Sequence, residues 1–180
     1  MKTFLFVLLL FIQQIYSQNI HTDSICTYSV TLPEGWSIEK INSPFDETEC
    51  AFGLKYFGWE EIASDTMYDV GEYAIYISIY DGSLYNDSES YIFEYRDSTW
   101  WINGRAGYQN EGTFIQTEEW IAIMGETEVG AYLKGGGYFG SASAYVAILD
   151  NKKGKLLEII ADSMFQSTTI FDSIVFSIRF

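Results

Sequence analysis

The chain has 180 residues and a formal net charge of −15, and 48% of its residues are hydrophobic. This apolar content, with 18% aromatic residues, excludes a disordered chain and is sufficient for the core of one domain. The acid excess argues against nucleic acid and anionic membrane surfaces as partners, because binding either of them needs a basic patch. A basic partner, cations or plain solubility are compatible with this charge.

Residues 1–17 have the pattern of a secretory signal peptide. Lys2 precedes an uninterrupted apolar run at 4–12, and Ser17 is a small residue directly before the expected cleavage point. The run is too short to span a bilayer, which disfavours a membrane anchor. We therefore expect cleavage after residue 17, and we expect residues 18–180 to form a single secreted or periplasmic domain that does not insert into a membrane.

Cys26 and Cys50 are the only cysteines of the chain. In an oxidising compartment such a pair predicts one disulfide, which would close a loop of roughly 25 residues and contribute about 3–4 kcal/mol in the loop-entropy model. Two buried free thiols are the alternative. No redox role is expected, because the chain has no Cys-x-x-Cys motif.

Strands predominate in the first half of the chain. Tyr28, Val30 and Leu32 alternate with polar residues, which is the period of a half-buried strand. The segment 73–80 is mostly apolar on both alternating faces, which predicts a strand covered on both sides. In chain order, we predict strands at 26–32, 36–38, 50–56 and 73–80, an acidic loop at 42–49, and an irregular segment at 57–71.

The hydrophobic period changes near residue 87. Asp87 or Ser88 can cap a helix that extends to about residue 96 and places Tyr91, Ile92 and Tyr95 on one side. An Asn-Gly dipeptide, flanked by strand-like segments, predicts a tight hairpin. The elements predicted here are hairpin strands at 100–102 and 105–109, further strands at 113–116 and 119–124, and a glycine-rich segment at 125–140 that is a flexible connection or a bulged strand.

The clearest pattern of the chain lies at 142–161. Two segments, 142–149 and 155–161, consist almost entirely of apolar or small residues, and turn-forming residues join them. This pattern predicts a hairpin at the centre of a sheet. Ser167 or Thr168 then caps a predicted helix through residue 175, and 177–180 is expected to close the sheet edge. The expected fold class is α+β, a mostly antiparallel β-sheet covered by a few helices.

Three motifs follow one another along the chain. They are Tyr-Ser-Val-Thr-Leu-Pro-Glu-Gly-Trp at 28–36, Trp-Ile-Asn-Gly-Arg-Ala-Gly at 101–107, and Phe-Asp-Ser-Ile-Val-Phe-Ser-Ile-Arg-Phe at 171–180, after the closing hairpin. In this order they resemble the PsbP-like family, which is named after an extrinsic subunit of the photosynthetic oxygen-evolving complex and includes exported bacterial domains. The resemblance implies an antiparallel sheet with helices on both faces and binding to other macromolecules, and it supplies no active site.

Nothing in the sequence predicts catalysis. His21 is the only histidine and lies in a polar segment, whereas a nucleophilic site needs a base held against its nucleophile. Two cysteines and one histidine at no ligand spacing do not predict a zinc site. We therefore expect no enzyme activity, no cofactor and no resident metal. A calcium site stays open at four oxygen-bearing residues near one loop, Asp81, Asn86, Asp87 and Glu89.

Tryptophans are the candidate binding residues. Trp59 precedes Glu60 and Glu61, an arrangement compatible with sugar stacking beside carboxylates. Trp100 and Trp101 are adjacent on a predicted strand, so their side chains face opposite sides, and an exposed one would mark an interface.

The sequence predicts an exported, acidic, non-catalytic binding protein. Its expected partner is another protein, and a basic protein suits its charge. A PsbP-like protein-interaction module is the leading hypothesis. An immunity-type inhibitor of a secreted toxin and a carbohydrate-binding protein are the alternatives.

Overall fold

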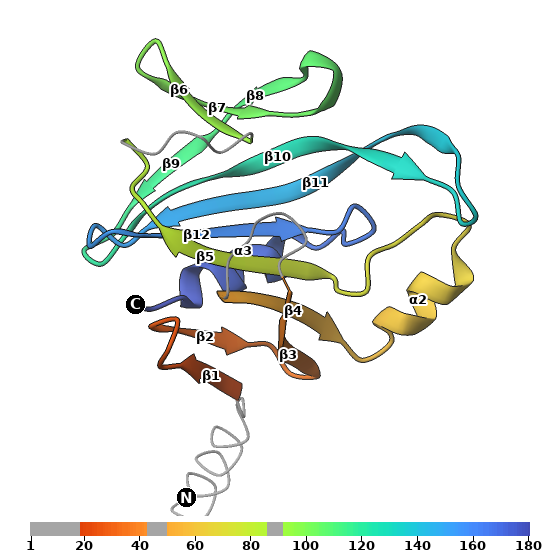
Figure 1. Ribbon diagram of the computed structural model, residues 1–180, viewed down its shortest axis with the longest axis horizontal. Helices are drawn as coiled ribbons and strands as arrows, with labels where there is room; N and C mark the ends of the chain where they lie inside the picture. The colour runs from red at the N-terminus through yellow and green to blue at the C-terminus, as the bar shows by residue number, and fades with distance from the viewer. Residues whose placement is uncertain (1–18, 43–49, 86–91) are drawn as a thin grey trace, which may run out of the picture.

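The computed structural model describes residues 19–42, 50–85 and 92–180. Its main sheet is seven-stranded and antiparallel, with the order β3-β4-β5-β12-β11-β10-β9 (Figure 1). The predicted central hairpin is confirmed as β11 and β12. The strands are β3 (Trp36–Ile41), β4 (Cys50–Tyr56), β5 (Ile75–Asp81), β9 (Thr113–Gln116), β10 (Ile121–Tyr132), β11 (Tyr138–Asp150) and β12 (Lys155–Ala161).

Two of the predicted segments fall wholly or mostly outside the described residues. They are the signal peptide at 1–17 and the acidic loop at 42–49. The strand β5 was predicted to be covered on both sides. Ile75, Ile77 and Ile79 are buried on one face; on the other, Ser78 is buried and Tyr76 and Tyr80 are half-buried, so the cover of that face is partial.

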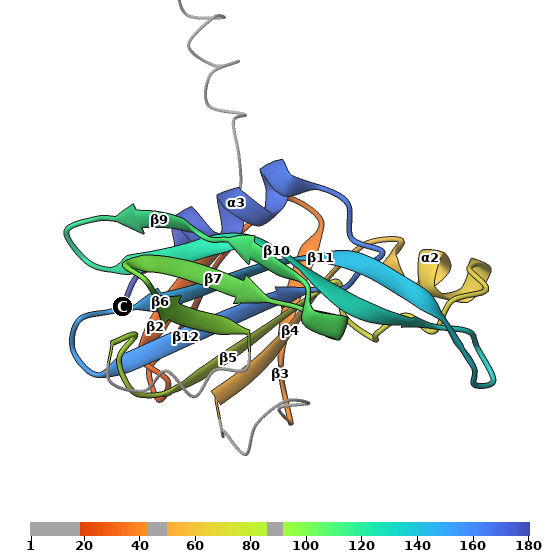
Figure 2. The same ribbon diagram turned by 90° about the horizontal axis from the view of Figure 1, so that it is seen from above.

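One face of the main sheet, here called the helix face, is covered by α3 (Thr168–Ser177) (Figure 2). The Ser167 hydroxyl accepts a hydrogen bond from the Ile170 amide at 3.4 Å, so the predicted cap is confirmed. Phe171, Ile174 and Val175 form the buried stripe of this helix and pack against the sheet.

A hairpin of β1 (Asn19–Asp23) and β2 (Tyr28–Leu32) also packs on the helix face. Cys26 follows β1 and forms a disulfide with Cys50 of β4, which confirms the predicted pair. Residues 177–180 do not close the edge of the main sheet. Arg179 instead exchanges backbone hydrogen bonds with Ser29 of β2, because α3 crosses the helix face and directs the chain toward that hairpin.

The opposite face, here called the small-sheet face, is covered by three strands rather than by a helix (Figures 1 and 2). These are β6 (Phe93–Arg96), β7 (Thr99–Asn103) and β8 (Gln109–Glu111), in that order. Phe93, Trp100 and Ile102 enter a second core against the main sheet. Within the described residues, helices on both faces are therefore not confirmed.

The prediction of a helix that ends near residue 96 is wrong for the described part of that segment, because β6 is a strand. The rest of that prediction, 86–91, lies outside the described residues. Asp97 and Ser98 have positive φ angles of 53° and 65°, and this two-residue turn pairs Arg96 with Thr99. Neither turn residue is glycine, so the usual sequence signal for such a hairpin is missing.

The predicted Asn103-Gly104 hairpin is corrected in its second strand. Arg105–Gly107 is a short 3₁₀ helix, η1, and β8 begins only at Gln109, which pairs with Asn103. The Thr127 hydroxyl donates a hydrogen bond to the Asn103 carbonyl at 2.7 Å. This contact holds the turn against β10 and accounts for the longer connection.

Two further segments differ from a plain loop. The segment 57–71, predicted to be irregular, contains the helix α2 at Trp59–Asp65. The glycine-rich segment 125–140 forms the ends of β10 and β11, with a register shift between Ala131 and Tyr132, so it is a bulged strand pair. No helix of the described part of the chain is long and apolar enough to cross a membrane.

Candidate functional site

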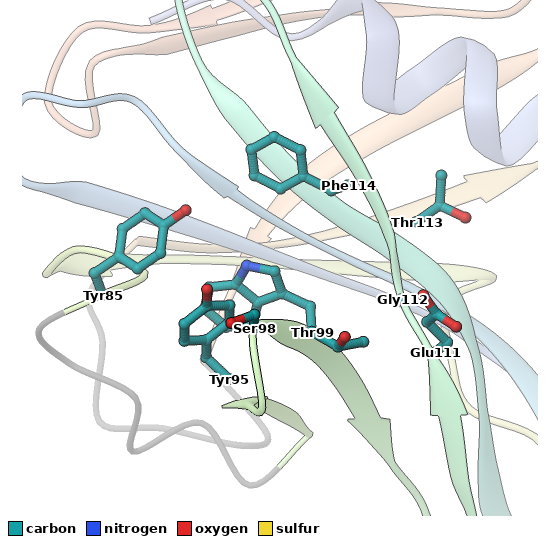
Figure 3. Close-up of a pocket in the computed structure, with 9 residues that line it drawn as sticks. Tyr85, Tyr95, Ser98, Thr99, Glu111, Gly112, Thr113 and Phe114 are labelled. Carbon is teal, nitrogen blue, oxygen red and sulfur yellow. The ribbon is translucent and has the colours of Figure 1, made fainter.

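A cleft rich in aromatic side chains lies on the small-sheet face, between the β6–β7 turn and β9 (Figure 3). Its volume is about 680 Å³. Three separate stretches of the chain contribute to it: the segment after β5, the β6–β7 hairpin, and the β8–β9 stretch. The residues that line this aromatic cleft are Tyr85, Tyr95, Ser98, Thr99, Trp100, Glu111, Gly112, Thr113 and Phe114.

Aromatic rings determine the character of the cleft. Trp100 is only 5% exposed, whereas Tyr85, Tyr95 and Phe114 are 58%, 48% and 46% exposed. The ring centroid of Trp100 lies 5.1 Å from that of Tyr95 and 5.7 Å from that of Tyr85. The two tyrosine rings stand at 85° to each other. The cleft therefore offers a ligand ring faces and ring edges in several orientations above a buried tryptophan.

The cleft exists because β7 and β9 diverge. The chain pairs with β7 along β8, passes Gly112, and then pairs with β10 along β9. The Gly112 amide donates to the Trp100 carbonyl at 2.8 Å. A Cβ atom at Gly112 would lie 2.5 Å from Cγ2 of Ile123, so glycine is needed where the chain passes this close to the main sheet.

Among the described residues that line the cleft, the polar side chains are one carboxylate and several hydroxyls. Glu111 carries the carboxylate, and Ser98, Thr99 and Thr113 carry hydroxyls. Glu111 is paired with Trp101 across β7 and β8, so its side chain lies on the face of the small sheet opposite to Trp100. The tyrosine and tryptophan rings can hold a cation by cation–π contact. Rings and hydroxyls can hold a sugar by stacking and hydrogen bonding.

The described residues hold no group of three or more His, Cys, Asp or Glu that could bind a metal ion. Of the four residues considered for calcium, the structure describes Asp81, which forms an ion pair with Lys155 at 2.6 Å. Asn86, Asp87 and Glu89 lie outside the described residues.

The structure places Trp100 and Trp101 on opposite sides of β7, as the strand period requires. Trp100 lines the aromatic cleft as its buried member. Trp101 is half-buried on the other side, where the guanidinium carbon of Arg96 lies 5.3 Å from its ring centroid. Its indole nitrogen is buried and has no hydrogen-bond partner among the described residues.

The structure separates Trp59, Glu60 and Glu61 from the cleft, because α2 lies at the other end of the molecule (Figures 1 and 2). Trp59 is fully buried, and its indole nitrogen donates to the Gly71 carbonyl at 3.1 Å. Glu60 and Glu61 are exposed. Lys55 binds Glu60 at 3.0 Å, and this hydrogen bond raises the pKa of the Lys55 ammonium. Trp59 is therefore a core residue, and no shared surface joins it to the two acids.

The cleft residues that the sequence did not single out are Tyr85, Tyr95, Glu111 and Phe114. Tyr95 was placed on a predicted helix, and Phe114 was one residue of a correctly predicted strand, β9. The alternation of β9 does indicate that Phe114 lies on the opposite face from Ile115. No local signal indicates that Tyr85 lies beside either strand.

Comparisons with known proteins bear on the fold. No protein-family model and no curated protein matches the sequence. Among solved structures, the chain is similar to the solution structure of cyanobacterial PsbP (CyanoP) from Synechocystis sp. PCC 6803, with a TM-score of 0.50. The fold is PsbP-like. The match covers 92% of this chain and 93% of CyanoP at 11% sequence identity, so the PsbP-like resemblance is one of fold.

Proposed function

We propose that this protein is an exported, non-catalytic protein-interaction module that binds a basic partner at the aromatic cleft. The observation that carries the proposal is the cleft itself: three half-exposed aromatic rings surround a buried tryptophan. Aromatic residues in a partly desolvated pocket are typical energetic centres of protein interfaces.

Charge supports a basic partner. The net charge is −15, and the described residues that line the cleft include one acid, Glu111, and no base. An arginine or lysine side chain of a partner can place its apolar stem and its charge against the faces of the rings. A basic toxin would be one such partner, which keeps an immunity-type inhibitor within this proposal.

Two observations support the compartment and the type of function. The Cys26–Cys50 disulfide is compatible with an oxidising compartment outside the cytoplasm. The PsbP-like fold is compatible with a protein-interaction module. A carbohydrate is the second candidate ligand, because aromatic rings and hydroxyls occur together in the cleft.

The test is a pull-down from an envelope extract of the source organism. The bait is the full chain, produced through a secretory pathway, as wild type and as Tyr95→Ala and Phe57→Ala. Phe57 is exposed but does not line the cleft, so Phe57→Ala is the matched control. We expect wild type and Phe57→Ala to capture a basic protein equally well, and we expect salt to release it. We expect the affinity of Tyr95→Ala for this protein to be lower by about tenfold or more.

Equal capture by Tyr95→Ala would contradict the role of the cleft. Absence of any captured protein, together with saccharide-array binding that Tyr95→Ala abolishes, would replace the protein partner with a carbohydrate.

A further inference from the structure

The strand β9 is a free edge of the main sheet. It stands at the end of the strand order, and within the described residues β10 is its only strand neighbour. At the end of the β9–β10 ladder, the Thr117 amide donates to the Trp120 carbonyl at 2.9 Å, so this pair is hydrogen-bonded. Hydrogen-bonded and non-hydrogen-bonded pairs alternate along an antiparallel ladder. Gln116 and Phe114 therefore belong to non-hydrogen-bonded pairs, and their backbone N–H and C=O groups point away from β10. These outward groups are a template for another strand.

A pocket lies on each side of this edge. The side chain of Phe114 enters the aromatic cleft on the small-sheet face. Ile115 points to the helix face, where it lines a second cleft of about 270 Å³ beside α3. Thr113 lines both clefts, so they meet at β9. The second cleft is lined by Thr113, Ile115, Met124, Gly125, Glu126, Tyr145, Thr168, Phe171, Asp172 and Phe176.

Pockets on both sides of an exposed strand suit one form of ligand. A peptide that adds to a sheet edge forms main-chain hydrogen bonds and sends successive side chains to opposite faces of the sheet. One side chain would enter the aromatic cleft and the next would enter the second cleft. A helical ligand would not present side chains to both faces of one edge in this way.

The charges define the chemistry of the segment. Among the described residues that line the two clefts, Glu111, Glu126 and Asp172 are acidic and none is basic. From residue 106 to residue 133 the sequence contains neither lysine nor arginine. The rings of the aromatic cleft suit a basic side chain through cation–π contact. The second cleft suits an apolar one, because Ile115, Met124 and Phe171 are among its walls.

We infer that an extended segment of the partner, alternating basic and apolar residues, adds antiparallel to β9 as an eighth strand of the main sheet. This inference rests on the proposed function and specifies how the partner binds. The basic residues of this segment lie opposite Phe114 and Gln116, and their backbone N–H and C=O groups form the hydrogen bonds to β9. The apolar residues alternate with the basic ones, and the backbone amides of the apolar residues point to solvent.

The first test uses a blocked synthetic peptide of about seven residues that alternates arginine and leucine. It is titrated into the full isotope-labelled chain and followed by amide chemical shifts. We expect the amides of Phe114 and Gln116 to shift more than those of Thr113 and Ile115, which face β10. N-methylation of the arginine amides is expected to abolish binding, whereas N-methylation of the leucine amides leaves it unchanged. The reverse pattern, or no binding of the parent peptide, would overturn the inference.

The second test changes one outward amide of β9. Gln116→Pro removes the outward N–H, and proline is tolerated on an edge strand at such a position. Gln116→Ala keeps the N–H and loses only the exposed side chain. We expect Gln116→Pro to bind the peptide about tenfold more weakly and Gln116→Ala to bind like wild type. Near-ultraviolet circular dichroism of both variants confirms that they are folded.

Tyr95→Ala separates the two proposals. If it weakens binding while Gln116→Pro and Gln116→Ala bind equally, the cleft binds a protein side chain without strand addition, and only the further inference fails. If neither Tyr95→Ala nor Gln116→Pro affects binding, both the cleft as the binding site and the strand addition fail.

Discussion

The two faces of the main sheet differ in what covers them. On the helix face, α3 and the β1–β2 hairpin bury a continuous core, and a disulfide holds the hairpin to β4. On the small-sheet face, three short strands cover a smaller core and leave the aromatic cleft beside β9. On the helix face, α3 lies along its apolar stripe on the sheet. On the small-sheet face, the chain leaves β8 at Gly112 to join β9, and the cleft lies where β7 and β9 separate.

The comparison indicates a division of labour between stability and binding. On the helix face the large side chains of α3 other than Phe176 are mostly buried, and removing one of them creates a cavity. In the aromatic cleft, three of the four rings are about half exposed, so their removal leaves less buried space behind. The helix face should therefore dominate the free energy of unfolding, and the cleft should dominate ligand affinity.

The largest expected effect is on the helix face. Ile174→Ala removes a fully buried side chain of α3 and is expected to lower the free energy of unfolding by about 2–5 kcal/mol. Phe176→Ala, on the exposed side of the same helix, is the control and is expected to cost about 1 kcal/mol or less. Urea unfolding followed by circular dichroism measures both. Equal losses would show that α3 does not stabilise this face through its buried stripe.

The second effect concerns the disulfide that joins the β1–β2 hairpin to the main sheet. Cys26→Ser combined with Cys50→Ser opens a loop with a sequence separation of 24 residues. The loop-entropy model gives a loss of about 3 kcal/mol. The free energy of unfolding of wild type, measured with and without reductant, should differ by the same amount. A variant as stable as wild type would mean that the hairpin is held by packing alone.

The third effect tests the cleft from within. Tyr95→Ala is expected to cost about 1 kcal/mol of unfolding free energy, because the ring is half exposed. Trp100→Ala, in contact with the same ring, is expected to cost about 3–5 kcal/mol because Trp100 is buried. Thermal and urea unfolding of the two variants measure the difference between their losses of unfolding free energy. A Tyr95→Ala loss as large as that of Trp100→Ala would make the cleft a part of the core.

The smallest effect is a pH dependence at the border of the helix face. Burial raises the pKa of Asp162, which accepts hydrogen bonds from the Gly71 and Met164 amides. Because the folded pKa lies above the unfolded one, its contribution to stability is full below about pH 3.9 and is lost as the pH rises through the folded pKa. Asp162→Asn lacks this titration.

Unfolding free energies of wild type and Asp162→Asn, measured from about pH 3 to about pH 7, test this sign. We expect wild type to lose stability relative to the variant as the pH rises. A difference that changes in the opposite direction would mean that the hydrogen bonds to the carboxylate outweigh its burial.

Some features followed from the sequence because they depend on near neighbours. The bounds of β4, β9 and β12 matched their predictions, since alternation along one strand is a local property. The cap at Ser167 and the buried stripe of α3 are likewise set by residues three or four apart. The Cys26–Cys50 pair needed only the count of cysteines, and the PsbP-like resemblance needed only the order of three motifs.

Other features were decided by tertiary structure alone. Trp59 is a core residue because α2 packs it against the sheet, although its acidic neighbours gave it the appearance of a surface residue. The strand β6 replaced a predicted helix because Asp97 and Ser98 adopt a left-handed turn without glycine. The aromatic cleft combines Tyr85, from the segment after β5, with Phe114 of β9, and β5 and β9 are not neighbours in the sheet. Local pattern determines which segments are strands, but which side chains meet across them depends on sheet order and long-range packing, which no local pattern encodes.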